Sequence, residues 1–133
     1  MSRPLALSRI DRMSDLPELG LGYPGTDLRR QLVAAVLSGA KTATAGLAGE
    51  EEPTAVGARY RVEDETGEPR AIVEVTEARV VPASEIDLAF ARDEGEGFES
   101  VEDWRQAHER FFERPIDADT MIEAIRFRVV ERL

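Results

Sequence analysis

Apolar residues recur every three or four positions in one early segment of the chain. Leu32 and Val36 belong to this pattern, which places apolar side chains on one side of an α-helix. Thr26 precedes the segment as a helix N-cap would, and Gly39 follows it where helices commonly end in a left-handed residue. The pattern predicts a helix over residues 27–38.

Other segments alternate between apolar and polar residues, as half-buried strands do. Ile125 and Phe127 alternate with arginines, and β-branched residues fill a long segment that stops at Pro82. A turn-forming Glu-Thr-Gly-Glu sequence at residues 65–68 joins two of the segments as a hairpin. We expect strands over residues 41–47, 58–63, 70–81 and 121–130.

Capping signals predict two more helices. Ser84 predicts a helix over about residues 85–92, and Ser100, followed by acidic residues in the first turn, predicts another that ends before Pro115. Because helices and strands are mixed and two strands form a hairpin, we expect an α+β fold rather than a doubly wound sheet. Its architecture is a small mixed or antiparallel β-barrel with flanking helices.

The length of 133 residues predicts a single domain over residues 1–133, with residues 1–25 a partly irregular N-terminal extension. The chain has no cysteine and one histidine, which excludes thiolate nucleophiles, disulfide frameworks and multi-histidine metal centres. Its 27 acidic and 17 basic residues give a formal net charge of −10, which opposes binding to duplex DNA.

Neither a signal-peptide core nor a membrane-spanning run is present in the sequence. We therefore expect a cytoplasmic protein without membrane contact.

Lysine occurs once, at Lys41, whereas the other 16 basic residues are arginine. Arginine stays protonated in proteins, but a buried lysine can lose its proton and act as a base. A lysine retained in so arginine-rich a chain indicates a role that arginine cannot perform. The alternative is chance, with a genomic preference for arginine.

Three short segments carry a family resemblance. Residues 39–44 read GAKTAT, residues 93–97 read DEGEG and residues 104–108 read WRQAH. In this order and spacing they resemble the ASCH domain family of the PUA-like superfamily, whose pattern is G-x-K-x-x-T, an acidic E-G-E-G-like loop and W-R-x-x-H. The resemblance covers roughly residues 20–130 and implies a β-barrel with a cleft. It also implies a nucleoside or a short single-stranded RNA as ligand.

One branch of this family removes the acetyl group from N4-acetylcytidine, and the resemblance implies its site residues here. Lys41 matches the base, Thr44 the nucleophile and Glu94 the acid. Glu96 is a rival for the acid, and Thr42 is the substitute nucleophile. The resemblance implies no cofactor and no metal. The chain differs from that branch in its N-terminal extension and its W-R-x-x-H helix, so its activity stays open.

The implied chemistry sets two physical conditions. A lysine base must be partly neutral and a glutamic acid partly protonated, so a tight ion pair between Lys41 and Glu94 would prime neither. Positions three apart on a regular strand point to opposite faces. Lys41 and Thr44 therefore converge only if Lys41 precedes the strand or a bulge intervenes.

Several other residues are candidate ligand contacts. Trp104 and His108 share a helix face, either as a base-stacking tryptophan beside a cleft histidine or as a core tryptophan with a hydrogen-bonded histidine. We expect Phe111 and Phe112 in the core. The candidate substrate contacts are Thr42, Glu96, Trp104, Arg105 and His108.

Three functions remain open from the sequence. The first is an amidohydrolase acting on an acylated nucleoside, and the second is a binding module for RNA or a nucleotide. The third is a metal-assisted ribonuclease whose acidic loop holds a divalent ion. Four strand arginines form either a basic face for phosphate or a row of solvated charges: Arg59, Arg61, Arg126 and Arg128.

Overall fold

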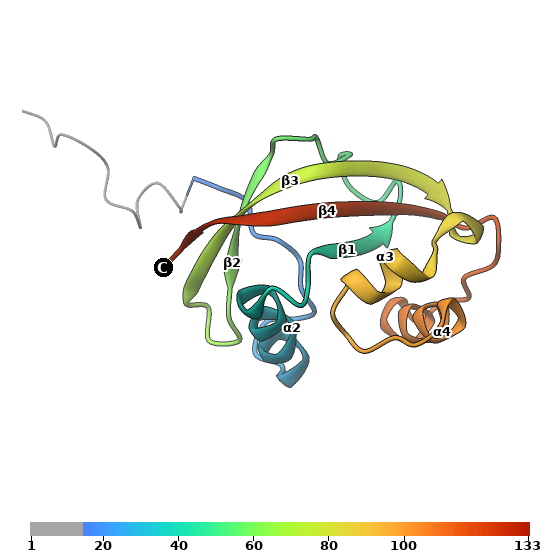
Figure 1. Cartoon of the computed structure of the whole chain (residues 1–133), viewed down its shortest axis with the longest axis horizontal. Helices are drawn as coiled ribbons and strands as arrows, with labels where there is room; N and C mark the ends of the chain where they lie inside the picture. The colour runs from blue at the N-terminus through green and yellow to red at the C-terminus, as the bar shows by residue number, and fades with distance from the viewer. Residues whose placement is uncertain (1–14) are drawn as a thin grey trace, which may run out of the picture.

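An antiparallel sheet forms the centre of the structure. The computed structural model describes residues 15–133, and within this range the strands form a four-stranded sheet in the order β1-β4-β3-β2 (Figure 1). The strands are β1 Ala43–Leu47, β2 Arg59–Glu63, β3 Pro69–Pro82 and β4 Met121–Arg132. All four expected strands are therefore present, and the two longest pair in the middle of the sheet.

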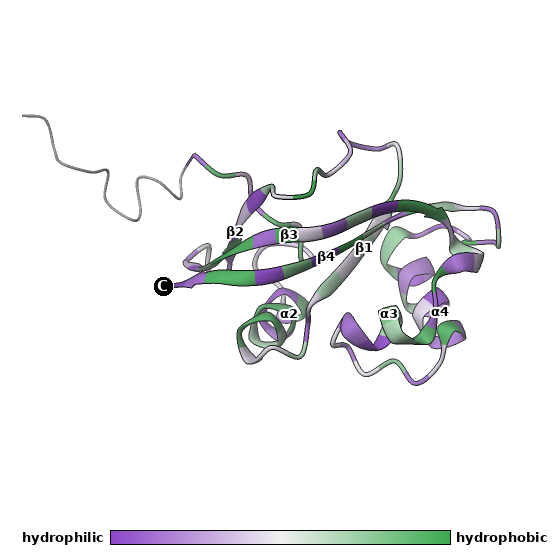
Figure 2. Ribbon diagram, turned by 45° about the horizontal axis from the view of Figure 1, so that its top comes forward, coloured by the Kyte–Doolittle hydropathy of each residue, from purple (hydrophilic) through white to green (hydrophobic). Residues whose placement is uncertain are grey.

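The two long strands are bent. Their register shifts between Ile72 and Val73 and again between Val75 and Glu77, and such bulges bend and twist a strand pair. The sheet consequently curls into half of a barrel (Figure 1). Apolar and polar stretches follow one another along β3 and β4 (Figure 2). In β4, Ile125 and Phe127 are buried on either side of the half-buried Arg126, so the alternation expected there is present. The expected α+β fold with an antiparallel, barrel-like sheet is confirmed.

Helices enclose two separate core clusters against the sheet. The helices of the described residues are α2 Asp27–Ser38, α3 Leu88–Asp93 and α4 Val101–Phe112, with a 3-10 turn η1 at Ala83–Glu85. Val33 of α2 packs in one cluster with Phe127. Phe90 of α3 and Trp104 of α4 pack in the other with Ile122. Within residues 15–133, no helix is long and apolar enough to cross a membrane.

Two helices begin where their caps predicted. The Thr26 side chain accepts a hydrogen bond from the backbone of Arg29 at the start of α2, and Gly39 ends that helix with φ 86°. The Ser100 side chain likewise accepts from the backbone of Asp103 at the start of α4. These side chains satisfy amide groups that have no partner within the helix.

The helix expected over residues 85–92 is wrong in its position. Asp87 caps α3 by accepting the backbone N–H of Phe90 at 2.8 Å, so the helix begins at Leu88. Ser84 lies in the 3-10 turn η1 instead. Two good capping residues lie three positions apart here, and the carboxylate of Asp87 is the one that meets a free helix amide.

Residues 15–25, the described part of the expected N-terminal extension, are largely without regular secondary structure, and they still contribute to the core. The backbone N–H of Leu19 donates to the Arg61 carbonyl at 2.9 Å, and the Arg61 N–H donates to the Pro17 carbonyl at 2.9 Å. This short ladder fixes the segment beside β2. Leu19 and Leu21 are buried in the cluster under α2. Residues 1–14 of the expected extension lie outside the described part of the chain.

Candidate functional site

A cavity of about 600 Å³ lies beside β1. Its walls come from residues 20–23, from β1 and the acidic loop that follows it, from α4, and from the loop between α3 and α4. This volume lies in the range of sites for small molecules. Five predicted site residues line the cavity: Lys41, Thr44, Glu94, Glu96 and His108.

The ammonium group of Lys41 is buried among oxygen atoms. Gly39 ends α2, and the Lys41 backbone N–H then donates to the Ala35 carbonyl at 3.0 Å. Lys41 Nζ donates to the Glu94 backbone carbonyl at 3.1 Å. It also lies 3.8 Å from Glu94 Oε1 and 3.7 Å from Glu96 Oε2, with 1% of the lysine side chain exposed. The ion pair that would prime neither a base nor an acid is therefore present.

Both carboxylate oxygens of Glu94 have partners. The indole Nε1–H of Trp104 donates to Oε2, and His108 Nε2 lies 3.3 Å from Oε1. Only 1% of the Glu94 side chain is exposed. A carboxylate taken out of water needs such compensation, and here an indole, an imidazole and an ammonium group provide it.

His108 is oriented by its own helix. Its Nδ1 lies 2.8 Å from the Trp104 carbonyl, and its ring stacks on the indole with centroids 4.3 Å apart. A carbonyl only accepts, so Nδ1 carries a proton, and Nε2 can donate to Glu94 only in the imidazolium form. Burial lowers the pKa of His108, but the hydrogen bond and charge of Glu94 outweigh burial and leave that pKa above its ordinary value.

Glu96 is the carboxyl group most open to the cavity within this cluster. Its side chain is 25% exposed, against 1% for Glu94. Burial raises the pKa of the Glu96 carboxyl, the charge of Lys41 opposes the rise, and the charge of Glu94 adds to it. A raised pKa is the property that a general acid needs, so Glu96 is a suitable candidate for that role.

A close approach of two loops holds this cluster together. The backbone N–H of Thr42 donates to the Asp93 carbonyl at 2.8 Å. Gly95 has φ +71°, and a Cβ placed on it would lie 2.7 Å from the Ala40 carbonyl oxygen and 2.8 Å from Lys41 Cα. Only glycine fits this position, so the GEG sequence brings the acidic loop against the chain at Lys41.

Thr44 and Lys41 meet the condition for their side chains to converge, which is that Lys41 lies before the strand that contains Thr44. β1 begins at Ala43, so Lys41 precedes the strand, and both side chains line the same cavity. Thr44 pairs with Ile125 of β4. Among residues 15–133, its hydroxyl forms no hydrogen bond, either with Lys41 or with another residue.

Three predicted substrate contacts lie away from the cavity. Thr42 is exposed and does not line it. Trp104 is 1% exposed and belongs to the core cluster around α3 and α4, so its ring faces are not open to a base. Arg105 pairs with Glu102 and Glu109 on the surface of α4. For Trp104, the structure matches the alternative of a core tryptophan beside a hydrogen-bonded histidine.

Aromatic residues at the cavity differ from the expected set. Phe111 and Phe112 are half-buried and line the cavity. Phe112 also packs against the core cluster of α3 and α4, so the expected core position holds in part for Phe112 and is wrong for Phe111. Tyr23 stacks on Phe111 with ring centroids 5.3 Å apart and is 60% exposed at the rim. The Tyr-Pro-Gly turn indicated a loop, but nothing in the sequence placed Tyr23 beside α4.

The cavity also contains more carboxylates than the motifs indicated. Glu123 of β4 lines it and accepts from the Thr54 backbone at 2.9 Å and hydroxyl at 2.8 Å. A second acidic loop, the Glu-Glu-Glu sequence at residues 50–52 after β1, forms part of the wall. With Glu94 and Glu96, these carboxylates outnumber the ammonium group of Lys41 among the lining residues, so the cavity is predominantly negative.

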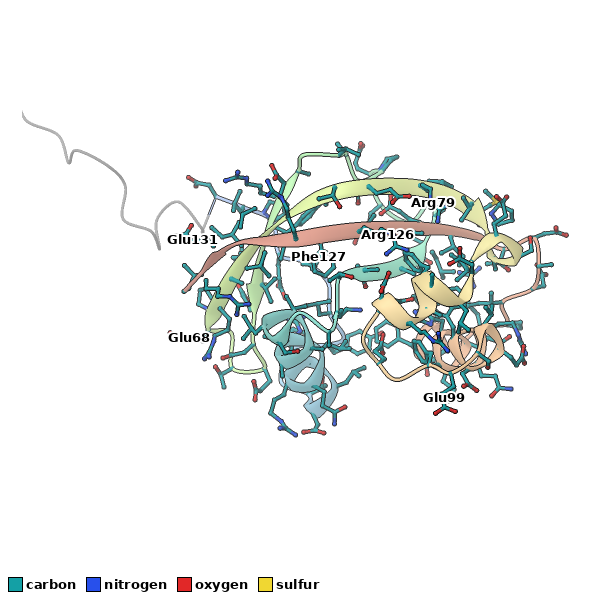
Figure 3. All side chains as sticks on the ribbon, viewed as in Figure 1. Glu68, Arg79, Glu99, Arg126, Phe127 and Glu131 are labelled. Carbon is teal, nitrogen blue, oxygen red and sulfur yellow. The ribbon has the colours of Figure 1, made fainter. Side chains whose placement is uncertain are left out.

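The four strand arginines do not form an open basic face, because each pairs with a carboxylate. The partners are Glu74 at 3.7 Å for Arg59, Glu63 for Arg61, Asp93 at 2.5 Å for Arg126, and Glu74 at 2.8 Å for Arg128. Arg126 lies on β4 over α3 (Figure 3), so its ion pair ties the end of α3 to the sheet. Their charges are therefore already compensated.

The loop at residues 93–97 is the acidic loop in which the ribonuclease alternative places a metal ion. Within residues 15–133, no three histidine or carboxylate side chains converge as a metal site requires. The ribonuclease alternative, in which the acidic loop holds a divalent ion, gains no support from the positions of Glu94 and Glu96. One of these carboxylates is occupied by Trp104 and His108, and both face Lys41.

The residues that form the site lie within a segment that matches a known protein domain. Residues 22–131 match the ASCH domain. The chain belongs to the ASCH domain family. The three segments that carried the resemblance come together in the structure, since the GAKTAT, DEGEG and WRQAH segments meet through Lys41, Glu94 and His108.

Solved structures of other proteins resemble this ASCH domain. An ASCH domain from Lactobacillus crispatus has a TM-score of 0.65 and 28% sequence identity, covering 74% of this chain and 70% of that one. A DUF984 protein from Enterococcus faecalis has a TM-score of 0.74 and 25% identity, covering 84% of this chain and 74% of that one. None of the curated proteins compared with the chain matches it.

Proposed function

We propose that this ASCH domain protein binds a nucleoside in the cavity beside β1. The supporting observation is the buried Lys41, whose ammonium is held by Glu94 and Glu96 at the wall of a cavity of about 600 Å³. A fixed cation next to oriented carboxylates can hydrogen-bond the carbonyl and amino groups of a base. The family resemblance, which implies an RNA or nucleoside ligand, agrees with this choice.

The charge of the cavity favours a nucleoside over a nucleotide or an RNA chain. Among the described residues, Lys41 is the only lysine or arginine that lines the cavity. Its ammonium group already faces two carboxylates. Glu123 and the loop at residues 50–52 add further negative charge. A phosphate placed there would meet like charges in partly desolvated surroundings, which disfavours binding.

Binding measurements test this proposal. Isothermal titration calorimetry should detect cytidine binding, with cytidine 5′-monophosphate weaker by about tenfold or more, equivalent to about 1.4 kcal/mol. Lys41→Met should abolish cytidine binding, whereas the matched control Arg110→Met, at an exposed position of α4, should retain it. Tighter binding of the monophosphate, or no nucleoside binding by the folded wild type, would contradict the proposal.

A second candidate is hydrolysis of an acylated nucleoside such as N4-acetylcytidine. It is favoured by the presence of Lys41, Thr44 and Glu96 around one cavity. In this reaction the Thr44 oxygen attacks the acetyl carbonyl and Lys41 takes its proton. The C–N bond breaks as Glu96 protonates the leaving amine, and water then hydrolyses the acyl-threonine. Glu96 suits the acid role better than Glu94, because burial raises the pKa of Glu96 and both Glu94 oxygens are engaged.

The free structure opposes this reaction at one step. Two carboxylates lie 3.7 and 3.8 Å from Lys41 Nζ, and an ion-paired ammonium group has no lone pair with which to accept the threonine proton. Nucleoside binding without turnover therefore fits the free geometry better. A ligand that displaced or neutralised Glu96 would be needed before Lys41 could act as a base.

Turnover assays separate the two candidates. If the chain is a hydrolase, N4-acetylcytidine should yield cytidine and acetate. Thr44→Ala, Lys41→Arg and Glu96→Gln should each lower kcat by at least about 100-fold, the usual scale of acid–base catalysis. The matched control Thr42→Ala, at an exposed position outside the cavity, should keep wild-type kcat. Binding without any cytidine release would reject the hydrolase and leave the binding protein.

A further inference from the structure

The outer backbone edge of β1 is unpaired beside the cavity. β1 is an edge strand of the sheet. The Phe127 N–H donates to the Thr42 carbonyl at 3.0 Å, and the Ala48 N–H donates to the Met121 carbonyl at 3.1 Å. Hydrogen-bonded pairs alternate along an antiparallel ladder. With Thr44 opposite Ile125, the even-numbered residues of β1 therefore bond to β4.

The odd-numbered residues of β1 consequently direct their backbone groups away from β4. Ala45 and Leu47 are opposite Ala124 and Ile122 in the non-bonded positions of the ladder. No other strand within residues 15–133 pairs with this edge. Each of these two residues therefore presents an N–H and a C=O group outward in the plane of the sheet.

The two residues that carry these outward groups also line the cavity. The side chains of Ala45 and Leu47 pack against the core cluster of α3 and α4, yet both residues line the cavity. Both residues are half-buried and lie between that cluster and the cavity, where their outward backbone groups can be reached from the cavity. Residues 20–23 and the end of α4 enclose the same space, so a bound molecule would lie along this edge.

Gly46 keeps the space beside the edge open. It lies between the two outward-facing residues, and a Cβ placed on it would meet no atom within 4 Å. Its side-chain position shares the face of Thr44, two residues earlier, because side chains alternate along a strand. A larger residue here would fill cavity space without disturbing the packed core.

We infer that the backbone edge of β1 at Ala45 and Leu47 binds the hydrogen-bonding edge of a nucleobase. Adjacent N–H and C=O groups of one strand residue complement the neighbouring acceptor and donor atoms on the edge of a pyrimidine or purine. The enclosed cavity suits a base better than an added peptide strand, because Ala45 and Leu47 are the only outward-facing strand residues among those that line it. This inference rests on the proposed nucleoside binding and assigns the base contact to β1.

Amide hydrogen exchange measured by NMR tests the inference with cytidine as the probe. In the free protein, the amides of Ala45 and Leu47 should exchange faster than those of Thr44 and Gly46, which bond to β4 and act as internal controls. Saturating cytidine should slow exchange of the Ala45 or Leu47 amide by at least tenfold and leave the controls unchanged. Cytidine-induced shifts at Lys41 without protection at β1 would overturn this inference alone. Absence of any cytidine-induced shift would overturn the proposed nucleoside binding and this inference with it.

A steric variant provides a second measurement. Gly46→Val should weaken cytidine binding at least tenfold while the thermal unfolding midpoint stays within a few degrees of wild type, since the added side chain meets open space. The matched control Thr76→Val, at an exposed position of β3, should leave cytidine affinity unchanged. Wild-type affinity in a folded Gly46→Val protein would overturn the inference.

Discussion

At the scale of single residues, each buried charged or polar side chain around Lys41 has a hydrogen-bond or ion-pair partner. Lys41, Glu94 and His108 are each at least nine-tenths buried, and every buried side-chain nitrogen or oxygen among the described residues has a hydrogen-bond partner. Burying such groups costs free energy that only their mutual contacts offset. The cluster therefore depends on the charges of its members, and the pKa of His108 is raised above its ordinary value by its contact with Glu94.

We predict that His108→Gln loses stability in a pH-dependent way. The pKa of His108 is raised above its ordinary value of 6.5, so its stabilising effect is fully present below about pH 6.5 and is lost as pH rises through the raised value. The wild type should exceed the variant by about 1.5–3 kcal/mol at pH 5.5, the scale of a hydrogen bond between charged groups. Urea unfolding of both proteins from pH 5.5 to 9 measures the difference.

The Glu96 carboxyl also has a raised pKa, and its effect on stability has the same sign. Both proteins contain Glu96, so subtracting their unfolding free energies largely cancels its contribution. A difference between wild type and His108→Gln that grows from pH 6.5 to pH 9 would contradict the assigned contact with Glu94.

At the scale of secondary-structure elements, contacts outside the sheet hold the site together, rather than pairing between two strands. The loop after α2 and the loop after α3 bond through Thr42 and Asp93, and they touch most closely where Gly95 lies against Ala40. The positions of Lys41, before β1, and of the acidic loop, after α3, are thus coupled. A change at the contact should alter both the stability and the cavity.

We predict that Gly95→Ala is far more destabilising than Gly97→Ala. Both glycines have positive φ, +71° and +83°, but an added Cβ meets backbone atoms at 2.7 to 2.8 Å only at Gly95 and meets nothing within 4 Å at Gly97. Each variant should lose about 1–2 kcal/mol for its left-handed backbone. Gly95→Ala should lose about 1–3 kcal/mol more from overpacking. Equal unfolding free energies of the two variants in urea would refute the close contact.

Negative charge dominates the surface and the cavity at the scale of the whole molecule. The formal net charge is −10, and strand arginines such as Arg126 and Arg128 are already paired with carboxylates. The described residues therefore offer no basic strand face to a polyanion, and electrostatic attraction to duplex nucleic acid is weak.

We predict that the protein does not bind duplex DNA. Fluorescence anisotropy of a labelled 20-base-pair duplex should show a dissociation constant weaker than about 0.1 mM at 50 mM salt, below the nonspecific affinity of basic DNA-binding proteins. Cytidine measured by calorimetry in the same buffer is the control for a competent cavity. Tight duplex binding that falls steeply with salt would contradict the charge argument.

Much of the fold follows from local patterns. The helix at 27–38 and the one that begins after Ser100 formed as predicted, because capping and periodicity are properties of neighbouring residues. The helix around 85–92 was misplaced because Ser84 and Asp87 both make good caps. Local chemistry alone does not decide between such competitors when packing selects one of them.

The sequence by itself determined the fold class, the family and the motif residues Lys41, Glu94 and Glu96, because each depends on residue types at fixed spacing. Only the tertiary structure decided which side chains meet in the cavity. It placed Tyr23 and Glu123 at the cavity and enclosed Trp104 in the core. These positions depend on strand register and helix packing, which join residues far apart in the sequence, such as Tyr23 with Phe111 and Thr54 with Glu123. Such contacts leave no periodic pattern in the sequence.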